Sequence, residues 1–131
     1  MHAIPEHYLA RAVPRYTSYP TAPHFRSGFP EETVRDWLGE LPAEEPVSLY
    51  LHIPFCKQMC WYCGCHTKIA ARYGPLADLT DRLIAEIELV AGLMGSAAPV
   101  AQVHWGGGSP NMLAPVDFAR LMAAIRTRFA A

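Results

Sequence analysis

Hydrophobic and polar positions alternate most clearly between Val47 and Ile53, where every second side chain is apolar. A period of two predicts a β-strand with one apolar face and one polar face. Pro54 ends this pattern, and a loop rich in cysteine follows from residue 55 to about residue 72. The first strand therefore leads directly into the most chemically unusual part of the chain.

A period of three to four residues replaces this alternation between Leu76 and Met94. Such spacing predicts an amphipathic helix, and Gly95 is the expected C-terminal stop. A second short strand is predicted over residues 100–105, and three consecutive glycines follow it as a loop. A further helix comes next. Its side chains expected to face inward are Phe118, Leu121, Met122, Ile125 and Phe129.

Residues 1–29 have neither period and are rich in proline, tyrosine and arginine, which predicts an extended arm. Their aromatic content is unusual for a disordered tail. A short helix is predicted over residues 30–41, because Pro30 suits a first helical position and an apolar face follows. We expect Trp37 on that face to be a core residue. Two domains are predicted: an arm with a short helix (1–46) and an α/β region (47–131).

The order strand, loop, helix, strand, glycine loop, helix predicts the α/β class, with two successive βα units and a parallel sheet. Two parallel strands alone make a poor sheet, because such sheets are normally covered on both faces. We therefore expect the first part of a larger barrel-like protein, with a third strand after the last helix. Active sites of such barrels lie at the C-terminal ends of the strands, where the cysteine and glycine loops are predicted.

Composition narrows the function classes. The chain has 131 residues, 51% hydrophobic and 18% charged, which excludes a disordered or fibrous protein. The formal net charge is −1, so no basic excess favours nucleic acid. No apolar run reaches the roughly 18 residues of a membrane span, and the N-terminus lacks the apolar region of a secretory signal. We expect a cytoplasmic monomer without a nucleic-acid or membrane partner.

Four clustered cysteines carry the candidate chemistry: Cys56, Cys60, Cys63 and Cys65. Structural zinc would usually need a second, separated cysteine pair, and none is present. A thioredoxin-like pair at 60 and 63 would leave Cys56 unexplained. An iron–sulfur cluster is the third interpretation, because short spacings let one loop wrap a cubane. The pattern C-x3-C-x2-C would supply three thiolates and leave the fourth iron open.

The role of Cys65 decides between an open and a closed cluster. As a fourth ligand it would give a fully ligated electron-transfer cluster of the ferredoxin kind. One intervening residue leaves little reach to a fourth corner, although Gly64 loosens the chain there. Both possibilities stay open on the residues alone.

The three-cysteine spacing after a first strand is the signature of radical S-adenosylmethionine (SAM) enzymes, and the glycine loop one βα unit later strengthens it. Related haem-chaperone-like proteins share part of this pattern but lack the N-terminal arm motif and usually have Cys-Asp-Phe at 63–65. The chain as a whole resembles the oxygen-independent coproporphyrinogen III oxidase family. The motifs that carry the resemblance are Arg15–Ala22, Tyr50–Cys56, Cys63–Cys65 and His104–Gly108.

This resemblance implies the fold of a partial (β/α)6 radical-SAM barrel, of which the chain would supply the first two βα units. It implies oxidative decarboxylation of two propionates of coproporphyrinogen III to vinyls, giving protoporphyrinogen IX in haem synthesis. The agent would be a 5′-deoxyadenosyl radical made from SAM with one electron from an unidentified donor. Further SAM contacts in the family come from later strands, so activity of this chain alone is left open.

The resemblance also implies residue roles. Cys56, Cys60 and Cys63 would hold a [4Fe–4S] cluster, and Cys65 matches a family cysteine that is not a ligand. Two SAM molecules are implied, one contacted by Tyr50 and Gly107, the other by Tyr62, Gly108 and Ser109. The family often has phenylalanine at the position of Tyr62 and threonine at that of Ser109, and both changes keep the relevant chemistry. A haem-chaperone-like relative and a non-catalytic zinc module remain the alternatives.

Overall fold

The computed structural model describes residues 22–95 and 97–130. The chain divides into two compact units, residues 1–30 and residues 31–131. In the first unit the described part contains one 3-10 turn, η1 (Ala22–His24). The arm motif that begins at Arg15 lies mostly outside the described residues. The second unit contains α2 (Glu31–Gly39), β1 (Val47–Ile53), β2 (Phe55–Cys56), β3 (Lys68–Ile69), α3 (Gly74–Met94), β4 (Val100–Gly107), η2 (Pro110–Met112) and α4 (Pro115–Arg128).

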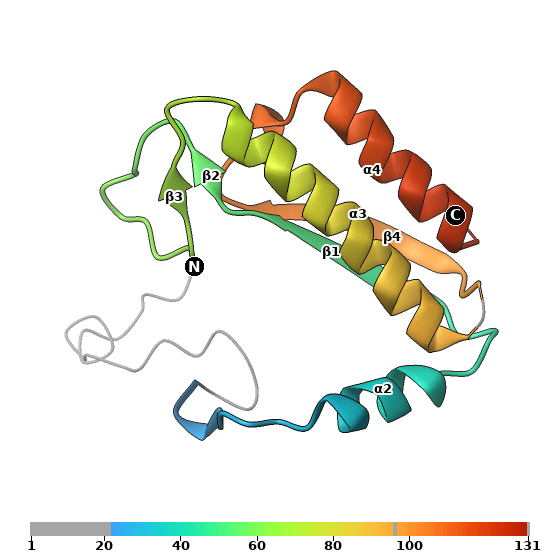
Figure 1. Cartoon of the computed structure of the whole chain (residues 1–131). Coiled ribbons are helices and arrows are strands. Elements are labelled where there is room, and N and C mark those ends of the chain that lie inside the picture. The colour runs from blue at the N-terminus through green and yellow to red at the C-terminus, as the bar shows by residue number, and fades with distance from the viewer. Residues whose placement is uncertain (1–21, 96, 131) are drawn as a thin grey trace, which may run out of the picture. The chain divides into compact units, whose positions relative to one another are not determined.

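A parallel pair of strands, β1 and β4, forms the centre of the second unit, and α3 connects them. Helices α3 and α4 lie side by side over one face of this pair (Figure 1). The core forms where that face meets the helices, around fully buried Ile53, Leu76, Leu121 and Ile125. The predicted α/β class and parallel βαβ unit are confirmed.

The opposite face of the strands carries polar and aromatic side chains. Tyr50 pairs with His104 in the register of β1 and β4, and their rings stack with centroids 5.7 Å apart. Tyr50 is 57% exposed, whereas its neighbour Leu51 on the other face is buried. The alternation of the sequence therefore separates a packed face from an open one.

Helix boundaries follow the residues that predicted them. Helix α3 has a proline in its first turn, and it ends at Gly95, whose φ of 68° is left-handed. Glycine adopts that conformation without the steric cost that a Cβ imposes. The short helix is also confirmed, although it is narrower than predicted, at Glu31–Gly39.

Two strand predictions were incomplete. The second strand extends beyond residue 105, because Gly106 and Gly107 still pair with His52 and Ile53 of β1. Glycine lacks a side chain but keeps its backbone donor and acceptor, so the glycine run starts inside the sheet rather than after it. Strands β2 and β3 within the cysteine loop were not predicted, since two residues each are too short to show a period.

The expected core position of Trp37 was wrong, and Phe118 faces inward as predicted but is only partly covered. Trp37 is 58% exposed, because α2 contacts the rest of the unit along one edge and buries none of its residues. Phe118 is 43% exposed and packs against Trp105, with ring centroids 4.9 Å apart. Both side chains lie at the margin of the packed layer rather than within it.

The segment after α4 meets the start of β4 at a single bridge. Phe129 is buried, and Ala130 forms an isolated parallel bridge with Pro99 at the start of β4. The N–H of Val100 donates to the carbonyl oxygen of Ala130 at 3.1 Å. Within the described residues, no helix is long and apolar enough to cross a membrane.

Candidate functional site

The cysteine loop is closed at its base by the parallel pair β2–β3, which we call the neck. The N–H of Lys68 donates to the carbonyl oxygen of Pro54 (2.6 Å), and that of Ala70 to the carbonyl oxygen of Cys56 (3.0 Å). Cys56 is buried here, at 8% exposure. Residues 57–67, which we call the tip, project from this neck. The first predicted cluster ligand therefore lies in the ordered base of the loop.

The glycine segment that follows β4 lies directly against this neck. The N–H of Gly108 donates to the carbonyl oxygen of Ile53, and that of Ser109 to the carbonyl oxygen of Phe55, both at 2.8 Å. The Ser109 hydroxyl donates to the Cys56 sulfur at 3.6 Å. The structure thus brings Cys56, Gly108 and Ser109, which sequence reasoning placed in one site, into direct contact.

Absent side chains make this close approach possible. A Cβ at Gly108 would lie 2.7 Å from the Cys56 sulfur and 2.6 Å from the Phe55 carbonyl oxygen. Gly107 has a φ of +100°, and a Cβ there would lie 2.8 Å from the Ile53 carbonyl oxygen. Both contacts are shorter than a real Cβ tolerates, so the positions require glycine. A backbone without side chains also lets a bound molecule approach its N–H and carbonyl groups.

Two consecutive hydrogen bonds through His52 connect the open face of β1 to the tip. His52 Nε2 lies 3.1 Å from the His66 carbonyl oxygen, and His52 Nδ1 lies 3.1 Å from the Tyr50 hydroxyl. A carbonyl oxygen only accepts, so Nε2 carries the proton, and in the neutral ring Nδ1 accepts from Tyr50. Hydrogen bonds therefore hold both ring nitrogens of His52. Tyr50 lies over Gly106, where a Cβ would be 2.6 Å from its hydroxyl.

Cys63 is the second cysteine with a defined environment. Its sulfur lies 3.6 Å from the hydroxyl of Thr67, which in turn lies 3.6 Å from the sulfur of Met59. The hydrogen bond with Thr67, followed by one with the backbone of Cys65, lowers the pKa of the Cys63 thiol below its ordinary value. A lowered pKa favours the thiolate, which is the form that binds metal.

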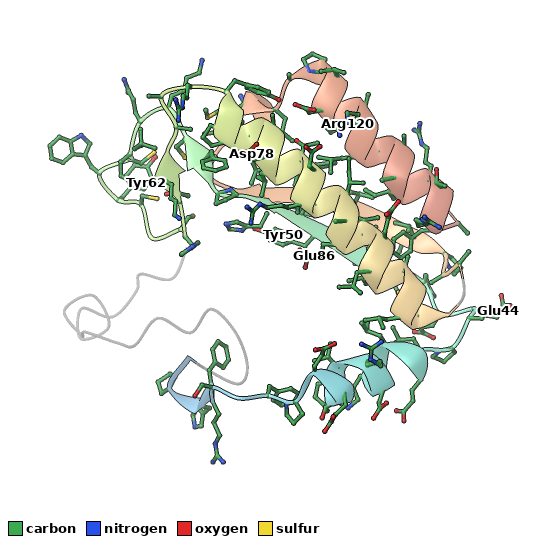
Figure 2. All side chains as sticks on the ribbon, in the orientation of Figure 1. Glu44, Tyr50, Tyr62, Asp78, Glu86 and Arg120 are labelled. Carbon is green, nitrogen blue, oxygen red and sulfur yellow. The ribbon has the colours of Figure 1, made fainter. Side chains whose placement is uncertain are left out.

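The remaining predicted residues lie on the exposed tip. Figure 2 shows Tyr62 there, away from Tyr50 on β1. Tyr62 is 88% exposed, and Cys60 and Cys65 are exposed as well. All four cysteines are free thiols. Among the described residues, no three histidine, cysteine or acidic side chains are gathered closely enough to hold a metal ion.

The donor set nevertheless fits an iron–sulfur cluster in kind. Free thiols are the ligands that such clusters use, and three of them lie at the required spacing in one loop. One thiol is fixed against the glycine segment, and a second has a lowered pKa. The fit rests on this chemistry and on the glycine contacts, whereas convergence of the three sulfurs requires the tip to close.

A cleft of ≈ 870 Å³ lies between the cysteine loop and the segment after β4. Among the described residues that line it, Lys57 and Arg72 are charged and none is acidic. Ser109 and Asn111 border it on one side, and Tyr73 on the other. The cleft therefore suits a ligand with negatively charged or polar groups.

Sequence reasoning missed several residues that build this site. Thr67 follows Cys63 by four positions, but no motif singles it out. The His66 contact uses a backbone carbonyl, which leaves no trace in the residue type. Tyr73 donates a hydrogen bond to Asp117 from 44 positions away, and such a separation has no periodic signal.

Comparison with known proteins agrees with this geometry. Residues 50–130 match the family model described as the radical SAM superfamily. An oxygen-independent coproporphyrinogen III oxidase from Bradyrhizobium diazoefficiens is 52% identical over 122 residues, which is 93% of this chain and 27% of that protein. The enzyme of the same name from Escherichia coli K12 is 44% identical over 117 residues, covering 88% of this chain and 25% of the relative.

A solved structure supports the same conclusion. The coproporphyrinogen III oxidase from Escherichia coli, described as a radical SAM enzyme, superposes with a TM-score of 0.77 at 39% identity. The match covers 87% of this chain and 26% of that one. The predicted resemblance to the coproporphyrinogen III oxidases is confirmed, and the chain spans about a quarter of the length of these relatives.

Proposed function

The chain belongs to the radical SAM superfamily, and on that premise we propose that it provides the cluster-binding part of an oxygen-independent coproporphyrinogen III oxidase. The proposed reaction is the oxidative decarboxylation of two propionate side chains of coproporphyrinogen III to vinyl groups. Its product is protoporphyrinogen IX. The partners are this substrate and an electron donor.

The observation that carries the proposal is the contact between the two predicted loops. Cys56 accepts a hydrogen bond from Ser109 and lies against Gly108, at the C-terminal ends of two parallel strands. A cysteine donor and a half-buried glycine backbone at this edge suit a metal cluster and an organic ligand bound side by side. Neither loop alone would favour this function as strongly.

Cys56, Cys60 and Cys63 would hold the [4Fe–4S] cluster, with Cys65 outside the ligand set. When bound, the cluster and SAM would supply a 5′-deoxyadenosyl radical that takes one hydrogen atom from each propionate, which then loses CO2 and passes one electron to a one-electron acceptor. The lowered pKa of Cys63 supports its role as a thiolate donor. Cys56 is held in place by the neck, so the tip that carries the other two thiols can close onto the same cluster.

Two SAM molecules are proposed. Tyr50 and Gly107 would contact the cluster-bound one: Gly107 is at the C-terminal end of the strand pair, and Tyr50 is on the open face of β1, three positions before the end of that strand. Gly108 and Ser109 contact the second, and the exposed ring of Tyr62 can stack on an adenine. Gly107 contributes through its bare backbone, which a larger residue could not present at a φ of +100°.

The same proposal extends to architecture and compartment. The bridge between Ala130 and Pro99 supports a third strand beside β4, as in a partial (β/α)6 barrel. In that arrangement residues 47–131 begin the barrel, and residues 1–46 precede it. Four neighbouring free thiols suit the reducing cytoplasm, where metal sites rather than disulfides are the usual use of clustered cysteine.

Metal analysis after anaerobic reconstitution tests the cluster assignment. We expect about four iron and four sulfide per chain, and a large loss of both in Cys63→Ser. Cys65→Ser is the matched control, because this thiol is on the same tip and should leave the iron content unchanged. Zinc without iron or sulfide contradicts the proposal and favours a structural zinc module.

A chimera tests the reaction. The chain would replace the corresponding segment of the Bradyrhizobium diazoefficiens relative, which is 52% identical to it. We expect anaerobic conversion of coproporphyrinogen III to its divinyl product. Stoichiometric haem binding without turnover contradicts this and identifies a haem-chaperone-like protein instead.

A further inference from the structure

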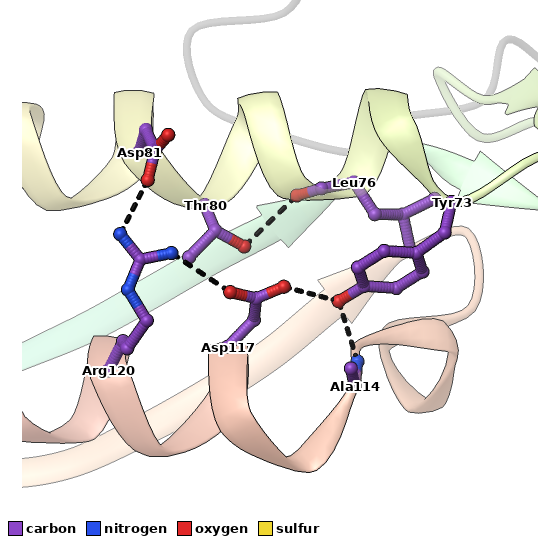
Figure 3. Close-up of polar contacts among 7 residues, drawn as sticks. All are labelled: Tyr73, Leu76, Thr80, Asp81, Ala114, Asp117 and Arg120. Atoms are coloured by element: carbon purple, nitrogen blue, oxygen red, sulfur yellow. Dashed lines mark hydrogen bonds and ion pairs between the residues drawn. The ribbon is translucent and has the colours of Figure 1, made fainter.

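Tyr73 connects the end of the cysteine loop to the start of α4. Its phenolic oxygen accepts the N–H of Ala114 at 2.8 Å and donates to a carboxylate oxygen of Asp117 at 2.5 Å. Figure 3 shows this phenol reaching across from the beginning of α3 to the first turn of α4. The residue therefore joins two segments that are 41 to 44 positions apart in the chain.

Helix α4 lacks a cap of its own. Its N-cap residue is Ala114, and no side chain at that position caps the helix. Serine, threonine, aspartate or asparagine would normally fill this role. Asp117 in the first turn favours the positive end of the helix dipole, and it is buried at 5% exposure. From outside the helix, Tyr73 instead accepts the N–H of Ala114 itself, the residue at the N-cap position.

Arg120, also on α4, binds the same carboxylate and connects it to α3. Arg120 forms ion pairs with Asp117 at 2.9 Å and with Asp81 of α3 at 2.5 Å. Asp117 thus receives hydrogen bonds from a phenol and a guanidinium, which satisfies a buried charge that would otherwise be costly. Tyr73, Asp117 and Arg120 form one connected network, which we call the Tyr73 clamp (Figure 3).

The clamp fixes the far end of the segment that carries the candidate ligand contacts. At its near end, Ser109 is bonded to Phe55 in the neck. At its far end, Ala114 is bonded to Tyr73. The ≈ 870 Å³ cleft lies between these two attachments and is lined by Tyr73 and Ser109. Releasing one attachment would leave this segment, and its contact with Cys56, held from one side only.

We propose that Tyr73 is a positioning residue that sets the separation between the cysteine loop and residues 109–114. Through this spacing it keeps the Ser109 hydroxyl on the sulfur of Cys56. The identity of the ligand rests on the proposed function, whereas the positioning role concerns the chain itself. Tyr73 contacts no reacting group and acts through Ala114 and Asp117.

Tyr73→Phe tests the inference, because it removes the hydroxyl and keeps the ring. Arg128→Gln is the matched control. Arg128 pairs with Glu88 at 3.3 Å and so joins the same two helices, α4 and α3, in their C-terminal halves. Asp117→Asn is the second variant of the clamp, and it keeps the size of the side chain while removing its charge. Circular dichroism and urea unfolding establish that each variant folds.

Amide hydrogen exchange and thiol alkylation of the metal-free chain are the measurements. In Tyr73→Phe we expect exchange over residues 109–114 to rise about tenfold, as the loss of two ordinary hydrogen bonds implies. Alkylation of buried Cys56 should rise several-fold, while exposed Cys60 reacts as before. Asp117→Asn should shift both quantities in the same direction, and Arg128→Gln should shift neither.

Unchanged exchange over 109–114 and unchanged Cys56 alkylation in folded Tyr73→Phe would overturn the inference. An equal rise in Arg128→Gln would overturn it too, because the effect would then reflect general helix stability. Failure of wild-type chain to assemble iron and sulfide counts against the proposed function alone. With a cluster assembled, the spectral change on adding SAM should weaken in Tyr73→Phe and persist in Arg128→Gln.

Discussion

The neck and the tip of the cysteine loop differ sharply, although they belong to the same loop. The neck holds Cys56 in a buried position, bonded to the glycine segment through its own backbone and through Ser109. The tip exposes Cys60 and Cys65, and its aromatic Trp61 is fully exposed. The chain therefore builds one half of the candidate site in advance and leaves the other half for the ligand to organise.

This difference has a physical origin. The neck continues β1 and contacts the end of β4, so the packing of the strand pair carries into it. The tip has a hydrogen bond between Cys63 and Thr67, and its His66 carbonyl accepts one from His52, but most of its residues are exposed. A loop with few buried contacts gains order from what it binds.

Gly108→Ala should have the largest effect, because it acts on the preformed half. The new Cβ would lie 2.6 Å from the Phe55 carbonyl oxygen, and backbone atoms must move to relieve that contact. We expect a loss of about 1–3 kcal/mol in the free energy of unfolding, measured in urea. Gly92→Ala is the control. Nothing lies within 4 Å of its Cβ, and a gain of roughly 0.5–1 kcal/mol is expected. An unaffected Gly108→Ala contradicts the tight contact.

The pH dependence of the free energy of unfolding should show that the Tyr73 clamp stabilises the preformed half of the site. Hydrogen bonds from Tyr73 and then Arg120 lower the pKa of Asp117 below its ordinary value of 3.8. Its contribution is therefore present above pH 3.8 and is lost as the pH falls through the lower folded-state pKa. Urea unfolding between pH 7 and pH 2 should show this loss, and Asp117→Asn should flatten the acidic limb. An equally steep acidic limb in Asp117→Asn would exclude this carboxylate as the source.

At alkaline pH the free energy of unfolding should fall as the pH rises, which is the opposite of the trend at acidic pH. Burial, followed by the hydrogen bond to Asp117, raises the pKa of Tyr73 above its ordinary value of 10.0. The stabilisation is complete below pH 10.0 and is lost as the pH rises through the higher folded-state value. Tyr73→Phe should remove this dependence, as followed by phenolate absorbance and urea unfolding together. A phenolate that appears at an unshifted pH in the folded chain contradicts the hydrogen bond between Tyr73 and Asp117.

Thr67→Val should produce a smaller, local change on the tip. The Thr67 hydroxyl is the main cause of the lowered pKa of Cys63, so its loss raises that pKa towards the ordinary 9.0. Alkylation of Cys63 near pH 7.5 should slow several-fold, because the thiolate is the reactive form. Thr127→Val on α4 is the control, and it should leave the rate unchanged. A faster reaction in Thr67→Val would contradict the assigned hydrogen bond.

Trp61→Ala should have the smallest effect on the metal-free chain. The side chain is fully exposed, so its removal should change the free energy of unfolding by less than about 0.5 kcal/mol. The comparison would be Leu121→Ala in the core, where roughly 2–5 kcal/mol is expected. A loss of several kcal/mol in Trp61→Ala would show that the tip is packed rather than open.

The parts of the fold that sequence predicted are those with a local period or a local stop. The alternation from Val47 to Ile53 gave β1, and the stripe ending at Gly95 gave α3. The prediction that Trp37 is a core residue was wrong. Hydrophobic spacing identifies the apolar face of a helix, but not how much of that face a neighbouring element covers. Strands β2 and β3 are too short to show a period, and they exist only because the loop closes on itself.

The residues of the candidate site likewise divide into those that a local sequence pattern could indicate and those that it could not. Cysteine spacing and the glycine run drew attention to the two loops, and the strand order predicted that these loops would meet. The family resemblance then implied roles for Cys56, Gly107, Gly108 and Ser109. The Tyr73 clamp joins residues that neither a motif nor a period connects, so only the three-dimensional structure reveals it. Cys60 and Cys63 are not gathered with Cys56 among the described residues, and their convergence on a cluster is part of the proposed function.

Electron paramagnetic resonance of the anaerobically reconstituted, dithionite-reduced chain, with and without SAM, tests the central claim most directly. A [4Fe–4S]⁺ signal that changes on adding SAM is the predicted result, because three cysteine ligands leave one iron open beside the glycine segment. Cys65→Ser should give the same change. A cluster signal indifferent to SAM in both proteins would contradict the claim that the cysteine and glycine loops form one ligand site.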